Sequence, residues 1–151
     1  MKPQFEILFL EDAFNFLKQL DRKHYEKVLY NIRRAQNETN SDLFKKLSND
    51  IWEFRTLYQG LQYRLLAFWD KTSSTETLVI STHGFIKKRS KVPENEIEKA
   101  IRLRTKYFED KKMYQNKSTT LFTSIMGNHQ HLTHKTKRLK ENCDHSVWCF
   151  S

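Results

Sequence analysis

The sequence predicts an α+β protein with one strand, two N-terminal helices, an antiparallel-rich twisted sheet and a C-terminal helix. Apolar residues recur at helical spacing in residues 14–32 and 97–104, whereas residues 51–86 hold alternating or short apolar runs bounded by turn residues. The chain has 151 residues, of which 38% are hydrophobic and 13% aromatic. That length and composition suffice to bury one core, so we expect one main folded domain.

The first predicted strand is the apolar run "FEILFL", residues 5–10. Glu11 and Asp12 follow and suit the positively polarised N-terminal end of a helix. Two stretches with helical spacing come next, marked first by Phe14, Leu17 and Leu20 and then by Tyr25, Val28, Leu29 and Ile32. Only Leu20–Arg22 separate them, which predicts an antiparallel helical hairpin with His24 on its surface.

Three antiparallel strands are predicted after the polar loop "QNETNSD", residues 36–42. In "DIWEFRTLY", residues 50–58, Trp52 and Phe54 alternate with Glu53 and Arg55, as in a half-buried strand. Gln59-Gly60 predicts a tight turn into "LQYRLLAFW", and "DKTSST" leads into "ETLVISTHGF". We therefore expect a meander.

The last helix is predicted to start at Pro93, whose missing N–H is not needed in a first turn, and to end at Tyr107–Asp110. From Lys111 onward the sequence loses periodicity and becomes polar. We therefore divide the chain into a folded domain, residues 1–110, and a basic, flexible extension, residues 111–151. We expect mobility from residue 116, with a short helix near "TTLFTSIM".

The net charge of +9 is concentrated in the second half of the chain. Residues 1–85 hold 12 Lys/Arg against 11 Asp/Glu, and residues 86–151 hold 15 against 7. This asymmetry predicts a polyanionic partner, either nucleic acid or an acidic protein. The sequence shows no bilayer-spanning run and no secretory leader, and both cysteines lie in the last nine residues, so we expect a cytoplasmic protein without membrane contact or disulfide framework.

Two arginines within predicted strands, Arg55 and Arg64, are the first candidate site residues. An exposed strand face on which Glu53 pairs with an arginine would explain each of them alone. However, the turn at residues 59–60 places them on adjacent strands, next to the basic run Lys87, Lys88, Arg89 and Lys91. Converging cations repel one another, which favours an anion as their partner, and arginine suits phosphate through paired hydrogen bonds.

The string "LSNDIWEFRTLYQGLQYRLLAFWD", followed by "TLVISTHGFIKKRSKVPENEIEKAIRLRTKYFE", resembles the phage-derived branch of the RelE/HigB-like toxins of type II toxin–antitoxin systems. The resemblance covers roughly residues 3 to 110. It rests on the "WEFR" strand, the "YR" of the next strand, and "GFIKK" before a helix that starts at a proline.

The resemblance implies a RelE-like fold and an endoribonuclease that cuts mRNA in the ribosomal A site without a metal or other cofactor. A ribose 2′-hydroxyl would attack the adjacent phosphate, and preorganised cations would stabilise the developing charge. Arg64 and Lys87 are the expected catalytic cations. Glu53 is either the base or a salt-bridge partner. The remaining candidates, expected to bind RNA, are Arg55, Lys88, Arg89, Lys91 and Phe85, the last by stacking on a base or else by closing the core.

Three functional alternatives follow. The first is the ribosome-dependent mRNA interferase, neutralised by a cognate helix-turn-helix antitoxin and meeting operator DNA only through it. The second is a non-catalytic protein of the same fold, acting in the antitoxin–DNA complex or as an RNA-binding module. The third, a basic adaptor for an acidic protein, would not need arginines within strands.

Histidines and cysteines suggest two further roles, each with a structural alternative. His83 is the histidine best placed to act as a general acid, although a histidine at a strand end is more often packed. The extension holds His129, His131, His134, Cys143, His145 and Cys149, but their spacing matches no usual structural zinc site, so we predict no metal.

Overall fold

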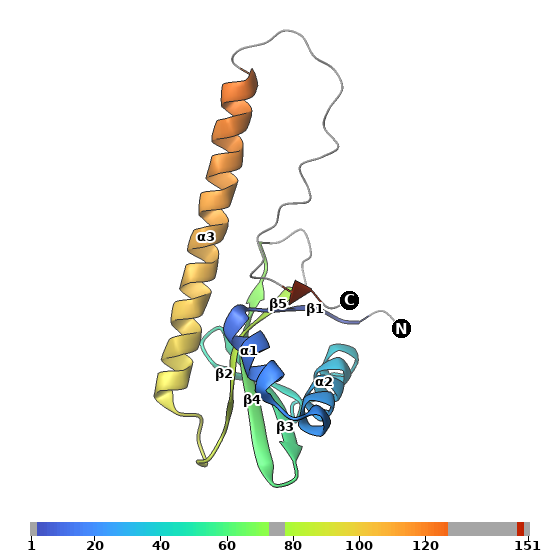
Figure 1. Cartoon of the computed structure of the whole chain (residues 1–151). Helices are drawn as coiled ribbons and strands as arrows, with labels where there is room; N and C mark the ends of the chain where they lie inside the picture. The colour runs from blue at the N-terminus through green and yellow to red at the C-terminus, as the bar shows by residue number, and fades with distance from the viewer. Residues whose placement is uncertain (1–2, 73–77, 127–147, 150–151) are drawn as a thin grey trace.

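The computed structural model describes residues 3–72, 78–126 and 148–149 and has the predicted α+β class, consistent with a RelE-like fold (Figure 1). Its elements in chain order are β1 Glu6–Phe9, α1 Glu11–Gln19, α2 Arg22–Asn37, β2 Phe44–Ser48, β3 Ile51–Tyr58, β4 Leu61–Asp70, β5 Leu78–Ile86, α3 Glu94–Met126 and β6 Trp148–Cys149.

One sheet has the strand order β2-β3-β4-β5-β1-β6. Strands β2 to β5 form the predicted antiparallel meander, and β1 pairs with β5 in parallel. The turn between β3 and β4 has positive φ angles of 48° at Gln59 and 76° at Gly60, as a two-residue hairpin turn requires. The predicted tight turn is therefore confirmed.

Strand β2, "FKKLS", was not predicted, because its two adjacent lysines break the apolar alternation. Both lysines are exposed, and the strand pairs with β3 at the edge of the sheet. Exposed lysines are common on edge strands, where they oppose pairing with another chain.

The two faces of the sheet are covered by different helices. The helical hairpin α1–α2 packs over one face, in a core that includes Leu17, Val28, Phe54 and Leu65. On the other face, Ala100 of α3 packs with a second cluster formed by Ile51, Leu66, Phe68 and Ile80. Alternation along the strands therefore assigns each strand residue to the hairpin face or to the α3 face.

His24 is not the surface residue that the sequence predicts. Its Nδ1 atom lies within hydrogen-bonding distance of the Tyr63 hydroxyl, and its Nε2 atom lies 3.0 Å from Gln59 Oε1. Both partners belong to the β3–β4 hairpin. The buried imidazole therefore fixes the start of α2 against this hairpin, a long-range contact that helical periodicity does not reveal.

Helix α3 continues to Met126, so its predicted end at residues 107–110 is wrong, and the short helix predicted near "TTLFTSIM" is part of α3. The predicted mobility from residue 116 onward stays a prediction. Its later turns extend past the sheet (Figure 1). The apolar periodicity ends near Tyr107, although α3 continues beyond it and Lys111 still contacts Asp70 of β4. Trp148–Cys149 pair with β1, and the rest of the predicted tail lies outside the described residues. No described helix is long and apolar enough to cross a membrane.

Candidate functional site

Arg55 and Arg64 lie directly opposite each other on β3 and β4. Alternation places both on the α3 face, away from the helical hairpin, as predicted. Phe85 of β5 is the neighbour of Arg64 on the other side. Like charges directly opposite in an antiparallel pair destabilise it, so the sheet holds this pair at a cost.

Glu53 lies between the two arginines and offsets part of that repulsion. Its Oε1 atom is 3.5 Å from Arg55 Nε, and its Oε2 atom is 3.3 Å from Arg64 Nε. Within the described part of the chain, Glu53 Oε2 and both Nε atoms have no hydrogen-bond partner, so these contacts are charge pairs without hydrogen-bonding geometry. The salt-bridge role of Glu53 is therefore present, and the three side chains carry a net charge of one positive unit.

Arg64 is much more buried than a surface phosphate ligand would be, with a relative exposure of 4%. Its Nη1 atom donates to the Tyr63 carbonyl at 2.9 Å and its Nη2 atom to Gln62 Oε1 at 3.1 Å. Burial lowers the pKa of Arg64, Glu53 raises it, and Arg55 lowers it again. Because the ordinary pKa of arginine is so high, the guanidinium stays charged at neutral pH.

Lys87 follows the end of β5 and continues its pairing, because its N–H donates to the Gln62 carbonyl at 2.8 Å. Alternation places its side chain on the same face as Phe85 and Arg64. Beyond it, between β5 and α3, Lys88, Arg89 and Lys91 are exposed. Among the described residues, none of these four cations forms an ion pair.

The fold thus brings Glu53, Arg55, Arg64, Phe85 and Lys87 together, with Lys88, Arg89 and Lys91 at the border of the same region. We call the first five the strand cluster. Phe85 is half-buried against the α3-face core and lies 6.1 Å from the His83 ring between centroids. This packing matches the core-closing role that the sequence left open for Phe85.

His83 is held on both ring nitrogens. Nδ1 lies 3.1 Å from the Thr82 hydroxyl and Nε2 lies 2.9 Å from Glu96 Oε2. The ring is 2% exposed, and burial lowers its pKa, against the opposing effect of Glu96. Both ring nitrogens are occupied by these partners, so neither is available to a substrate. His83 therefore links β5 to the start of α3 as a packed residue and does not have the position of a general acid.

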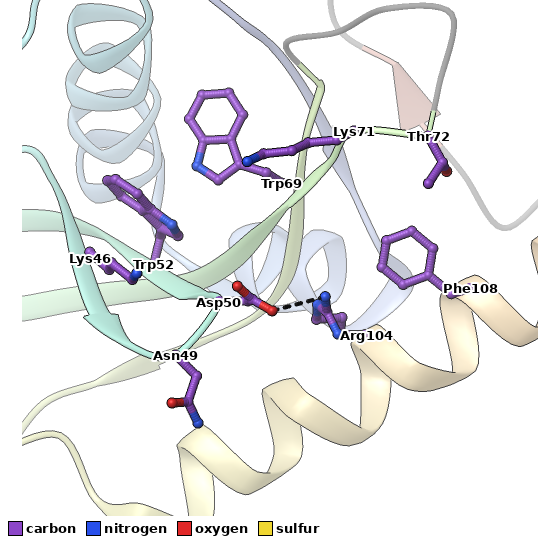
Figure 2. A pocket seen from close by; sticks show the side chains of 9 residues that line it. All are labelled: Lys46, Asn49, Asp50, Trp52, Trp69, Lys71, Thr72, Arg104 and Phe108. Carbon is purple, nitrogen blue, oxygen red and sulfur yellow. Dashed lines mark hydrogen bonds and ion pairs between the residues drawn. The ribbon is translucent and has the colours of Figure 1, made fainter.

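Sequence reasoning missed a cavity of about 660 Å³ at the other end of β4. It lies between the β2–β3 turn, the end of β4 and α3 (Figure 2). Its lining includes Lys46, Trp52, Trp69, Lys71 and Arg104. These three cations and two tryptophans are spread over 59 positions of the sequence, from Lys46 to Arg104, so no local sequence pattern identifies them as one site.

Metal ligation finds no support in the part of the chain that the structure describes, where no three His, Cys, Asp or Glu residues cluster. Of the six residues in the extension that could be zinc ligands, only Cys149 is described, in β6. The other five lie outside the described residues.

Comparison with known proteins agrees with this architecture. No curated protein matches the chain. The family described as phage derived protein Gp49-like (DUF891) matches residues 15–105, which span the second half of α1, all of α2, the meander and the first turns of α3. The match covers more than half of the sequence and includes the whole strand cluster. The chain therefore belongs to the phage-derived Gp49-like family, a toxin-like family of toxin–antitoxin systems, which implies an antitoxin as its partner.

Proposed function

We propose that this protein is a RelE/HigB-like toxin that binds the ribosome in the cytoplasm and cleaves mRNA there. The observation that carries the proposal is the direct pairing of Arg55 with Arg64, next to Lys87 on the same sheet face. A fold tolerates such converging cations more readily when an anion is bound during function. A phosphate in the RNA backbone supplies that anion.

In the proposed reaction, the ribose 2′-oxygen forms a bond to the adjacent phosphorus, and the bond from phosphorus to the 5′-oxygen breaks. Glu53 accepts the 2′-hydroxyl proton, and water supplies a proton to the leaving 5′-oxygen. Negative charge develops on the non-bridging oxygens. Arg64 and Lys87 stabilise that charge, and Arg55 contacts a neighbouring phosphate.

Arg64 is buried, so an RNA phosphate cannot reach its guanidinium without a local rearrangement. Its guanidinium is tied to Tyr63, Gln62 and Glu53, so contact with a phosphate requires these partners to rearrange. Catalytic contacts are often loose or misdirected before substrate binds and tighten in the complex. The exposed Lys88, Arg89 and Lys91 provide the surface on which ribosomal RNA can first bind.

The burial of Arg64 also favours a second candidate function. A non-catalytic protein of this fold would use the exposed cations to bind RNA, or would act in an antitoxin–DNA complex, while Glu53 and Arg64 stabilise the sheet. In both readings a helix-turn-helix antitoxin is the proposed partner, and operator DNA is reached only through it.

Purified ribosomes programmed with a defined mRNA distinguish the two. The proposal expects new 5′ ends, detected by primer extension, when the protein is added. Arg64→Ala and Lys87→Ala should each lower the cleavage rate by roughly 100-fold or more, the scale seen when one transition-state donor is removed. Lys23→Ala, an exposed change on α2, is the control and should cleave like the parent. Ribosome binding without new 5′ ends would refute the catalytic proposal and support the second function.

A further inference from the structure

The cavity at the end of β4 combines charge with aromatic surface. Besides Lys46, Lys71 and Arg104 it contains one carboxylate, Asp50, whose Oδ2 accepts a hydrogen bond from Arg104 Nη2 at 3.1 Å (Figure 2). Lys46 and Lys71 are exposed, and neither pairs with a carboxylate among the described residues. The cavity therefore carries an excess of positive charge on side chains that are available to a ligand.

Arg104 is held in place by its surroundings. In addition to its bond with Asp50, its guanidinium carbon lies 5.2 Å from the centre of the Phe108 ring and 5.9 Å from that of Phe68. Cations over aromatic rings at these distances are attracted to them. One wall of the cavity thus has a fixed positive charge, while the two lysines supply movable ones.

The two tryptophans are anchored on their inner sides and contribute their remaining surface to the cavity. Trp52 stacks on Phe44 with centroids 5.0 Å apart, and Trp69 packs edge-on against Phe5 at 5.4 Å. The indoles meet each other at 81° with centroids 6.1 Å apart. Both remain partly exposed. Anchored rings lose little further freedom when a flat ligand stacks on them.

We propose that this cavity binds an unpaired nucleotide of RNA, with the base against the tryptophans and the phosphate against Lys46 and Lys71. Rings and cations side by side are how proteins hold single-stranded nucleic acid, because every base has a face that can stack and every phosphate carries a charge. Paired bases are hidden in a duplex and cannot stack on the indoles. An acidic peptide would use the lysines alone.

The inference rests on the proposed function for the choice of RNA, but it concerns a second site. Trp69 follows Arg64 by five positions on β4, an odd number, so alternation places Trp69 on the hairpin face of the sheet and Arg64 on the α3 face. The tryptophans therefore do not face the strand cluster, and an RNA that contacts both must pass around an edge of the sheet.

The test measures binding of a fluorescently labelled single-stranded decauridylate to the full chain by anisotropy, without ribosomes, at several salt concentrations. Lys46→Ala/Lys71→Ala should weaken binding at least tenfold at low salt. It should also reduce the slope of log affinity against log salt by about 1.4, since each lost phosphate contact removes about 0.7 for single strands. Trp52→Phe should weaken binding several-fold and leave the slope unchanged, because stacking releases no counterions.

The matched control is Lys23→Ala/Arg33→Ala, which removes the same charge from exposed positions on α2. It should bind like the parent. Equal weakening by the two double variants would overturn the inference in favour of general attraction to a basic protein. Equal affinity for a duplex of the same length, or tighter binding of a poly-glutamate peptide, would overturn it as well. This test measures binding and not cleavage, so it is independent of the ribosome assay. A protein that binds as expected here but produces no new 5′ ends on ribosomes would refute the proposed function and leave the RNA-binding cavity supported.

Discussion

Asp70 is the residue on which the attachment of α3 to the sheet can be tested most directly. It lies at the end of β4 and is fully buried. Its carboxylate accepts hydrogen bonds from the backbone and the hydroxyl of Thr72 at 2.9 and 2.7 Å, from the Tyr107 hydroxyl at 2.8 Å and from Lys111 Nζ at 2.6 Å. Burial alone would raise the pKa of Asp70, but the bonds from Lys111, Thr72 and Tyr107 outweigh it and lower the pKa from 3.8 to about 2.

The substitution Asp70→Asn keeps the shape of the side chain and one acceptor oxygen while removing the charge. The difference between pKa values of 3.8 and about 2 corresponds to about 2 kcal/mol in the free energy of unfolding. Because the folded pKa is the lower one, this stabilisation is present in full above about pH 5. It is lost as the pH falls from there towards 2, where the folded carboxylate is protonated too.

Urea unfolding at pH 7, 5, 4 and 2.5 measures the gap between the parent and Asp70→Asn, which is the difference in their free energies of unfolding. We expect about 2 kcal/mol at pH 7 and 5, and a progressive decrease below pH 4. Asp42→Asn, at an exposed position without an ion pair among the described residues, is the matched control and should show a gap near zero throughout. A gap at Asp70 that does not change with pH would refute the electrostatic reasoning and leave only a packing effect.

Three further predictions concern the sheet around the strand cluster. Glu53→Ala leaves the buried Arg64 facing another arginine and should lower the free energy of unfolding by about 3–5 kcal/mol; adding Arg64→Met should restore much of it, and a double variant no more stable than Glu53→Ala would contradict this. Gly84→Ala places a Cβ against the Phe16 ring, too close for van der Waals contact, and should cost about 1–3 kcal/mol in urea unfolding; a smaller cost in a Phe16→Ala background identifies the clash, and an equal cost excludes it. Burial lowers the pKa of His83, so the unfolded chain binds a proton more readily than the folded one, and the free energy of unfolding should decrease from pH 7 to 5.5. His83→Gln should make this decrease smaller. A decrease of the same size in the variant would assign the pH dependence to other groups.

The sequence alone determined the features that depend on short-range pattern. Period-two alternation and the Gln59-Gly60 turn were enough to place Arg55 and Arg64 on adjacent strands and on one face, because a two-residue hairpin fixes the register of both strands. The helical hairpin and the start of α3 near Pro93 followed in the same way from local spacing and capping preferences.

Only the tertiary structure decided the rest, because it depends on contacts between residues far apart in the chain. Asp70 and Lys111 are 41 positions apart, and their contact shows that α3 is still docked on the sheet where its apolar pattern has ended. Asp50 and Arg104, 54 positions apart, together close one wall of the cavity. The burial of Arg64 is likewise a property of its neighbours in space: the sequence places a charge on a sheet face, and packing determines how much of that charge water can reach.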